Sequence, residues 1–294
     1  MKLKQVIPTT SAYAHLRFVF SIFLLPVYLF AFSQVPFIQP TKAILIFFIW
    51  HFLAYPASNG YNSYFDKDED SIGLLEKPPK VDISLYYFSI LLELTAFILG
   101  FFVGWEFAVS VLLYGVMSKL YSHPTTRLKK YPVISFLTVF FFQGAFIYYT
   151  TYSALAGLSL YRYWDPSFIL AGVICSCLIG ASYPLTQIYQ HDEDSRRGDK
   201  TISLLLGYKG SFIFSGALFT LGIVCSFFYW HGAGKIVYFY FFLLCSFPIF
   251  LFFNYWLYLV GTSTVNADFK NAMKMNFLSS GCMLMYFGVL AILK

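Results

Sequence analysis

The chain has 294 residues, of which 59% are hydrophobic and only 12% are charged. A soluble domain carries about 25% charged residues, so this chain has too little polar surface to stay dissolved and is predicted to be a membrane protein. Its formal net charge of +6 is modest and no basic run suits nucleic acid, so we expect no nucleic-acid partner.

Apolar runs of about 20 residues, the length at which a helix crosses the hydrocarbon core of a bilayer, follow one another along the whole chain. They predict an all-α bundle of about nine transmembrane helices that forms a single membrane domain over residues 1–294. Only Gly104 and Trp105 separate the fourth run from the third. The predicted spans are 14–34, 43–64, 83–103, 105–121, 132–153, 167–190, 211–230, 236–260 and 271–293.

Positive charge lies mostly at one end of this predicted bundle. The amino terminus and the loops after the second, fourth, sixth and eighth spans hold 13 Lys and Arg, whereas the opposite loops hold three, namely Lys42, Arg162 and Lys235. By the positive-inside rule, we expect a multi-pass plasma (inner) membrane protein whose amino terminus and basic loops are cytoplasmic. Of the 14 acidic residues, 11 lie at the same end, and a cation site is the simplest explanation because insertion does not require them there.

The first acidic motif follows the second span and reads Asn62-Ser-Tyr-Phe-Asp66-Lys-Asp-Glu-Asp70. Residues four and eight apart share one face of a helix, so on a helical extension Asn62, Asp66 and Asp70 form one stripe. Mg2+ prefers oxygen ligands and takes a few carboxylates together with substrate phosphates and water. The alternative is an acidic loop in solvent that binds nothing.

A second acidic motif follows the sixth span, with Gln190 and Asp194 again four residues apart. Asn62 and Gln190, like Asp66 and Asp194, are separated by 128 residues, which is the length of four spans. A four-span repeat keeps its orientation in the membrane, so the sequence predicts a pseudo-two-fold four-helix repeat in which the two stripes face each other. Two facing stripes favour a cation site over a solvated loop.

Cations held in this way need an anionic partner, and basic side chains beside the motifs are candidates for contacting it. Arg suits bidentate contact with phosphate, which favours Arg127 and Arg196, and each basic residue has the alternative of serving only as a positive-inside anchor. The basic candidates are Lys77, Arg127, Lys129, Lys130, Arg196, Arg197 and Lys200.

These motifs resemble those of the UbiA-type superfamily of intramembrane prenyltransferases. Asn62, Asp66 and Asp70 match the family's Asn-x-x-x-Asp-x-x-x-Asp pattern, with a following Lys77-Pro78. Asp194 matches the second acid of its Asp-x-x-x-Asp motif, and Gly198, Lys200 and Thr201 match the Gly-x-Lys-Thr that follows. The segment from Leu120 to Lys130, which contains Tyr121, is similar to a tyrosine-and-basic segment between the family's fourth and fifth helices.

The resemblance implies a Mg2+-dependent enzyme that ionises an isoprenyl diphosphate to an allylic cation. It implies metal ligands at Asn62, Asp66, Asp70 and Asp194, with Gln190 standing where the family has its first acid and offering one neutral oxygen. Among these, Asp66, Asp70, Asp194 and Arg127 are the catalytic candidates. The candidates for substrate binding are Asn62, Lys77, Tyr121, Lys129, Lys130, Gln190, Arg196 and Lys200.

Three functions remain open from the sequence. The first is transfer of the isoprenyl group to an aromatic or other hydrophobic acceptor dissolved in the membrane lipid. The second is a terpene cyclase of the same superfamily, which needs no acceptor and which the Gln190 departure keeps open. The third is a divalent-cation transporter, which is disfavoured because transporters hold their ionisable ligands near the bilayer midplane between inverted repeats.

Overall fold

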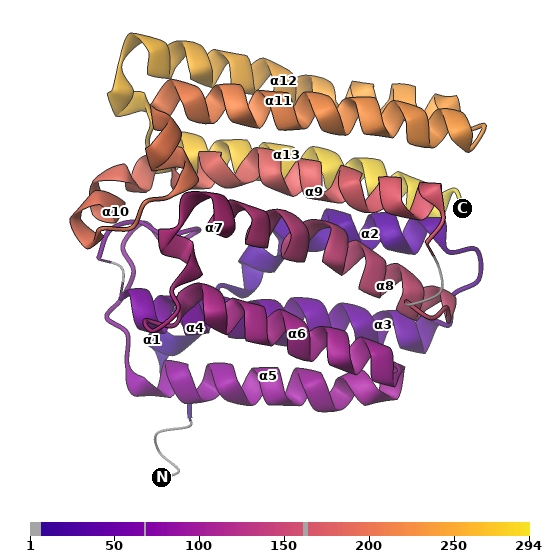
Figure 1. Ribbon diagram of the computed structural model, residues 1–294, viewed down its shortest axis with the longest axis horizontal. Helices are drawn as coiled ribbons and strands as arrows, with labels where there is room; N and C mark the ends of the chain where they lie inside the picture. Colours follow the sequence, from indigo (N-terminus) through magenta and orange to yellow (C-terminus); the bar gives the residue numbers. More distant parts are fainter. Residues whose placement is uncertain (1–6, 68, 161–163) are drawn as a thin grey trace.

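A computed structural model describes residues 7–67, 69–160 and 164–294, and almost all of its regular structure is helical. The helices lie roughly parallel in one bundle (Figure 1). Within the described residues, the only β-type pairing is an isolated bridge between Ile72 and Leu75. The α-helices are α1 (Thr10–Leu16), α2 (Leu25–Gln34), α3 (Pro40–Phe48), α4 (Tyr55–Asp66), α5 (Ile83–Val103), α6 (Trp105–Ser122), α7 (Pro132–Val139), α8 (Phe146–Ala156), α9 (Pro166–Gln187), α10 (His191–Arg197), α11 (Ile202–Gly232), α12 (Ile236–Thr262) and α13 (Phe269–Ile292).

Eight continuous helical stretches of the described chain are long and apolar enough to cross a membrane. They coincide with eight of the nine predicted spans. The ninth is α6, which carries Glu106 and Lys119 and runs back beside α5 (Figure 1). The prediction of an all-α membrane bundle of about nine helices is therefore confirmed.

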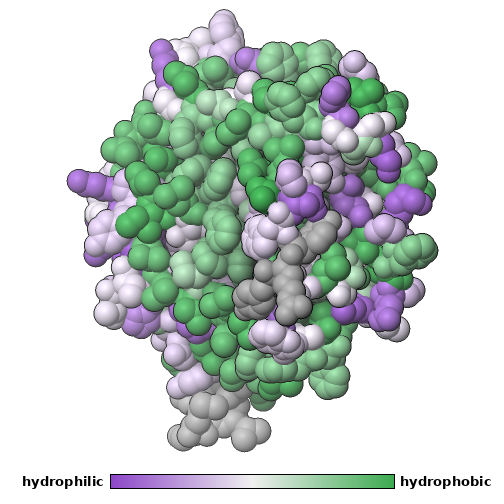
Figure 2. Space-filling view, turned by 45° about the vertical axis from the view of Figure 1, so that its right-hand side comes forward, coloured by the Kyte–Doolittle hydropathy of each residue, from purple (hydrophilic) through white to green (hydrophobic). Residues whose placement is uncertain are grey.

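Side-chain exposure agrees with a lipid environment. Phe102, Ile213 and Leu244 each expose more than two thirds of their surface, whereas Trp50 and Trp256 are fully buried. Figure 2 shows hydrophobic side chains over most of the visible face. A surface of this kind would aggregate in water and suits the hydrocarbon of a bilayer, so the chain is a multi-pass membrane protein. Arg162, which contributed to the charge count, lies outside the described residues.

Several spans are broken near their middle. The first changes to the 3-10 segment η2 (Phe18–Leu24), and the second and fifth contain the π-helical segments η3 (Ile49–Ala54) and η5 (Phe140–Ala145). A π-segment leaves backbone groups without their usual helical partners, and at Ala145 the freed N–H donates to Ser176 Oγ of α9 at 3.0 Å. Neighbouring helices therefore satisfy the breaks, as hydrocarbon requires.

The second and sixth spans correspond residue by residue at the predicted offset. Tyr55-Pro56 in α4 is matched 128 positions later by Tyr183-Pro184 in α9, and Asn59 is matched by Gln187. With Asn62 and Gln190 this gives amide side chains at two equivalent positions of each repeat. Gln190 therefore agrees with the internal symmetry of this chain, because the residue equivalent to it is also an amide.

Two predicted boundaries differ from the structure. Helix α4 ends at Asp66, because Lys67 adopts a left-handed backbone with φ 50° and donates its N–H to the Ser63 carbonyl. The prediction that a helical stripe extends to Asp70 is therefore wrong beyond Asp66. Helix α11 begins at Ile202, where Thr201 caps it, with a short helical segment before the predicted span; non-helical Gly207, with φ 68°, then interrupts the helix shortly before the predicted start at 211.

The four loops at 67–82, 123–131, 198–201 and 263–268 all lie at one end of the bundle, on the left of Figure 1. This arrangement follows from the alternating directions of the spans. It brings the ends of α4 and α10, which carry the two acidic motifs, to the same end of the molecule.

Candidate active site

The two acidic motifs line one cavity of about 190 Å³, which we call the acidic cavity. Asn62 and Asp66 reach it from α4, and Gln190 and Asp194 reach it from the start of α10. The structure therefore brings together four of the five predicted metal ligands, drawn equally from the two repeats. The first two positions of each predicted stripe share the cavity because residues four apart on a helix point the same way.

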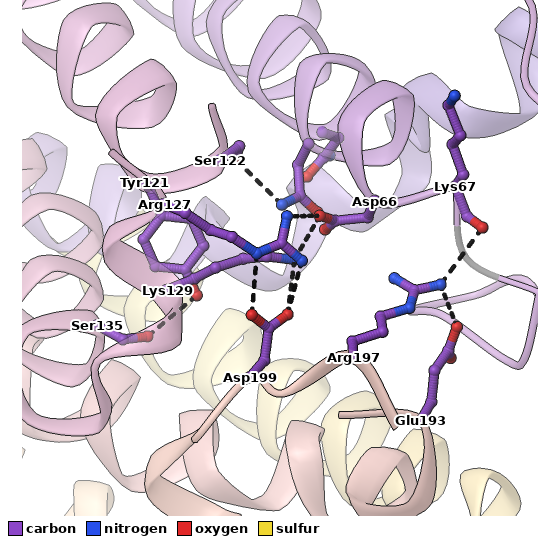
Figure 3. Close-up of polar contacts among 12 residues, drawn as sticks. Asp66, Lys67, Tyr121, Ser122, Arg127, Lys129, Ser135, Glu193, Arg197 and Asp199 are labelled. Carbon is purple, nitrogen blue, oxygen red and sulfur yellow. Dashed lines mark hydrogen bonds and ion pairs between the residues drawn. The ribbon is translucent and has the colours of Figure 1, made fainter. Parts of the chain in front are cut away.

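A network of alternating charges lies at one side of this cavity, where Asp66, Lys129 and Asp199 line it and Arg127 contacts them from outside the lining (Figure 3). Lys129 pairs with Asp66, whose side chain is only 4% exposed, and its Nζ lies 3.8 Å from Asp199 Oδ2. Arg127 makes a two-pronged contact with Asp199, with Nε–Oδ1 at 2.9 Å and Nη2–Oδ2 at 2.7 Å. Its Nη1 also lies 3.7 Å from Asp66 Oδ1. Both cations come from the loop before α7, so this loop ties the two motifs together.

Asp199 is held ionised by this network. Burial alone raises the pKa of its carboxyl group, but the hydrogen bonds from Arg127 and the charge of Lys129 outweigh burial and lower that pKa below its usual value. The result is a wall that keeps two cations and two carboxylates close together, with each charge compensated by its neighbours.

The second motif contributes further residues to the cavity lining. Thr201 Oγ1 donates to Asp194 Oδ2 at 3.2 Å while it also accepts the Leu204 N–H, so the cap of α11 fixes the Asp194 carboxylate. Gln190 Nε2 donates to the Ser71 carbonyl at 3.2 Å, which holds the loop after α4 against α10. Because the amide nitrogen makes that bond, the Gln190 oxygen is the atom left to contact a ligand.

Hydroxyl groups line the inner end of the cavity. Tyr121 and Tyr183 meet at 2.6 Å between their Oη atoms, and Ser135 Oγ lies 2.7 Å from Tyr183 Oη. Asn62 Nδ2 donates to Ser122 Oγ at 3.0 Å, which leaves its Oδ1 as the atom that can contact a cation. Tyr121, a predicted substrate-binding residue, thus borders the same cavity as the acidic motifs.

The remaining candidates, like Arg127, lie outside the lining of the acidic cavity. Asp70 pairs with Arg196 at the surface, where their side chains are 57% and 68% exposed. Lys77 and Lys200 are exposed, and Lys130 lies over the ring of Tyr131 at 5.0 Å. Asp70 leaves the cavity because the helix ends four residues earlier.

Two acidic residues of the cavity, Glu193 and Asp199, were not selected from the sequence, whereas their neighbour Arg197 was a basic candidate. Glu193 is 6% exposed, pairs with Arg197 and accepts the Glu69 N–H at 3.3 Å. Arg197 donates to the Lys67 carbonyl at 3.3 Å, so this pair joins α10 to the end of α4 (Figure 3). Asp199 is the second missed acid. The sequence did contain a signal for Asp199. It is a single acid close to the second motif, between Gly198, which ends α10, and Thr201, which caps α11.

The donor set fits a divalent cation only in part. Across 7–67, 69–160 and 164–294, no three His, Cys, Asp or Glu side chains lie close enough to form a metal site by themselves. Mg2+ commonly takes one or two carboxylates and completes its shell with substrate phosphates and water. Asp66 and Asp194, with the oxygens of Asn62 and Gln190, suit that partial role.

Two further cavities continue from the acidic cavity into the bundle. A cavity of about 220 Å³ shares Asn62, Tyr121 and Tyr183 with it. A third, of about 250 Å³ and mostly apolar, shares Ser182 and Ser279 with the second. A charged group bound at the end of the bundle thus has a path toward membrane depth for an attached apolar chain.

Fold and site together define a class, namely a polytopic membrane protein built on a four-span repeat whose two acidic motifs meet in one cavity. The sequence matches the UbiA prenyltransferase family over residues 21–278, and the chain belongs to this family. The resemblance noted in the sequence is confirmed, and with it the class of prenyltransferases.

Named relatives come from archaea. The chain is 30% identical over 195 residues to digeranylgeranylglyceryl phosphate synthase of Thermococcus kodakarensis, a match that covers 63% of this chain and 65% of the relative. It is 28% identical over 206 residues to the enzyme of the same name from Pyrococcus horikoshii, covering 68% of each chain. The match thus spans just under two thirds of the first of these relatives.

Solved structures extend the likeness over nearly the whole chain. A UbiA homolog from Archaeoglobus fulgidus bound to DMAPP and Mg2+ superposes with a TM-score of 0.69 at 16% identity, covering 97% of this chain and all of the homolog. The same homolog bound to GPP and Mg2+ gives a TM-score of 0.68 at 18% identity, covering 96% of this chain and all of that one. At this identity the likeness establishes the fold.

Proposed function

We propose that this protein transfers an isoprenyl group from an isoprenyl diphosphate to a lipid-soluble or aromatic acceptor, with Mg2+ as the cofactor. The observation that carries the proposal is the acidic cavity, in which oxygen donors from two facing motifs lie beside Lys129 and Arg127. A diphosphate is the kind of ligand that needs both metal ions and cations. The homologs bound to DMAPP and Mg2+ or GPP and Mg2+ support the same ligand class.

Mg2+ would be held by Asp66 and Asp194, with the amide oxygens of Asn62 and Gln190 in support, and would offset the charge that develops on the leaving diphosphate. Asp70 contributes in this scheme only if the loop after Asp66 turns inward when the substrate binds. That movement would have to break its surface pair with Arg196, which costs little because both side chains are more than half exposed.

The residues of the chain have separate tasks in the transfer. Lys129 and Arg127 provide cationic groups for the diphosphate oxygens, and in the structure they pair with Asp66 and Asp199. The bond between C1 of the isoprenyl group and the diphosphate oxygen breaks, and both electrons leave on the diphosphate. The acceptor then supplies an electron pair to C1, and the proton that it loses passes to water. The rings of Tyr121 and Tyr183 border the position of the resulting cation.

Terpene cyclisation is the second candidate. It uses the same ionisation step, and it is supported by the departure at Gln190 from the acid that the family has at this position. Cation transport is not supported by the positions of the acids, because Asp66 and Asp194 lie at one end of the bundle and the repeat keeps the same orientation in the membrane.

The proposal is tested by incubating the purified protein with Mg2+ and geranyl, farnesyl or geranylgeranyl diphosphate, with and without hydroxylated lipid and aromatic acceptors. We expect diphosphate release that EDTA abolishes and a prenylated acceptor in the organic phase. A cyclic hydrocarbon formed without acceptor would favour the cyclase. No diphosphate release under any condition would contradict both enzymatic proposals.

A further inference from the structure

The second cavity, of about 220 Å³, has several uncharged polar side chains in its lining. It adjoins the acidic cavity at Asn62 and Tyr121, so it lies where the reacting end of a bound isoprenyl diphosphate would be. Its lining includes amide and hydroxyl side chains from several spans, for example Asn59 of α4, Gln143 of η5 and Asn276 of α13. We call it the neutral chamber, because none of its described lining residues is Asp, Glu, Lys or Arg.

Asn276 is a buried polar residue of this chamber whose donor is unsatisfied. Its side chain is 5% exposed, it lines the neutral chamber, and its Nδ2 atom has no hydrogen-bond partner in the protein. A buried amide that donates no hydrogen bond is costly in a medium without water. A ligand that offers an oxygen lone pair would satisfy it.

Isoprenoid chains offer no such oxygen. The polar lining therefore does not serve the isoprenyl group, which consists of hydrocarbon alone and would fit the mostly apolar third cavity better. The group that matches the neutral chamber is the polar part of the acceptor, and it lies close enough to the acidic cavity for its nucleophilic atom to reach the allylic carbon.

We propose that the neutral chamber selects acceptors whose polar group is uncharged, such as a hydroxyl or carbonyl group, over acceptors that carry a carboxylate or phosphate. This inference rests on the proposed prenyl transfer and narrows its acceptor class. Asn276 donates to the acceptor oxygen and so helps to bind it, while the lack of charge in the described lining disfavours an anion. A preference for uncharged acceptors differs from what the name of the two relatives suggests, because digeranylgeranylglyceryl phosphate contains a phosphate.

Charge supports this selection. An anionic acceptor in the chamber would find no countercharge in the lining and would also face the negative diphosphate. The cations beside the acidic cavity have partners in the protein: Lys129 pairs with Asp66 and Arg127 with Asp199, and Arg17 donates to the Asn59 carbonyl at 3.4 Å. In the same way, Lys119 of α6 pairs with Glu93 and is not part of the lining.

Two pairs of acceptors that differ in a single anionic group test the inference with the wild-type protein. The first pair is methyl 4-hydroxybenzoate and 4-hydroxybenzoate, and the second is 1-O-hexadecylglycerol and its phosphate ester. With geranylgeranyl diphosphate and Mg2+, we expect the uncharged member of each pair to have at least a tenfold higher kcat/KM. For a pair that is not turned over, the uncharged member is expected to raise Tm more at equal concentration.

A higher kcat/KM or a larger rise in Tm with the anionic members would overturn the inference, as would equal values or no response to any of the four compounds. Failure of the proposed function has a different signature, namely that no diphosphate is released with or without any acceptor. A protein that releases diphosphate but prefers anionic acceptors keeps the proposed function and loses this inference alone.

Asn276→Leu tests the residue itself. We expect the variant to raise KM for methyl 4-hydroxybenzoate at least tenfold, and an unchanged KM would overturn the assignment of Asn276. The matched control is Gln34→Leu, which removes another amide at the opposite end of the bundle, where Gln34 accepts from Tyr229. This control should keep the wild-type KM. If Asn276→Leu does not fold, the acceptor pairs on the wild type still decide the proposal.

Discussion

Asp199 shows how a single residue outside both predicted stripes can hold the site together. It is 4% exposed and accepts two hydrogen bonds from Arg127, while Lys129 lies within ion-pair distance. Removing one partner of a buried charge pair leaves the other uncompensated, which costs far more than losing a surface pair. Asp70 and Arg196 provide the surface pair for comparison in the same molecule.

We therefore predict that Asp199→Asn lowers the free energy of unfolding by about 3 kcal/mol, whereas Asp70→Asn lowers it by less than about 1 kcal/mol. Both substitutions remove one carboxylate from a pair with an arginine, so they are matched in chemistry and differ in burial. Thermal unfolding in detergent at constant pH measures both. Equal losses would show that the Asp199 pair has no special role.

The depressed pKa of Asp199 gives this effect a pH dependence. A carboxyl group whose pKa is lower in the folded state stabilises the fold above its unfolded pKa, which is about 3.9, and loses that contribution as the pH falls through its folded pKa. The difference in Tm between the wild type and Asp199→Asn should thus be full at pH 6 to 7 and shrink below about pH 4. A difference that grows on acidification would contradict this account.

At the scale of single elements, regular spacing was predictable and helix ends were not. Asn62 and Asp66, like Gln190 and Asp194, were found because positions four apart on a helix share a face. The prediction for Asp70 assumed that the helix continued, and the left-handed backbone of Lys67 ends it instead. No glycine or proline marks that end, so the sequence carries no signal for it.

Loop residues were harder to predict for a physical reason. Arg127 and Lys129 were candidates as basic residues near a motif and through the likeness of their segment to one in the family. Their contacts with Asp66 and Asp199 depend on how the loop before α7 folds. Glu193 was missed because it lies next to Asp194 on a short helix, where spacing alone does not separate a cavity residue from an exposed one.

Close packing around η5 makes a prediction at this scale. A Cβ atom added at Gly144 would lie 2.7 Å from the backbone nitrogen of Ser176 in α9, which cannot move without shifting the helix. Gly144→Ala should therefore destabilise the protein by about 1 to 3 kcal/mol. Gly281→Ala is the control, since a Cβ there meets nothing within 4 Å, and it should be neutral or stabilise the helix by up to about 1 kcal/mol. The free energy of unfolding of the two variants is measured in the same detergent. Equal stability of Gly144→Ala and Gly281→Ala would contradict the proposed close packing at Gly144.

At the scale of the whole molecule, the alternation of spans follows from composition and was predicted almost completely. The weak fourth span is the helix α6, which has two charged residues and lies beside α5. Orientation in the membrane is a separate matter, because it depends on the charge asymmetry of the loops and on no contact within the bundle.

Orientation can be measured with single cysteines on the two sides. We predict that a membrane-impermeant maleimide labels Lys235→Cys in intact cells and labels Lys77→Cys only after the membrane is opened. Lys235 precedes α12 at the end opposite the acidic cavity, and Lys77 lies in the loop after α4. The native cysteines are buried or half-buried, which keeps the background low. The reverse labelling pattern would place the acidic cavity outside the cytoplasm.

In the proposed reaction, carboxylates of the acidic cavity support metal-dependent loss of diphosphate from an isoprenyl donor. The most direct measurement compares Asp66→Asn, whose side chain lies in the cavity wall, with Asp192→Asn, an exposed neighbour of the second motif that does not line the cavity. With saturating Mg2+ and geranylgeranyl diphosphate, we predict that Asp66→Asn loses about 100-fold or more of the rate of diphosphate release and that Asp192→Asn keeps the wild-type rate. A folded Asp66→Asn protein that releases diphosphate at the wild-type rate would contradict the claim.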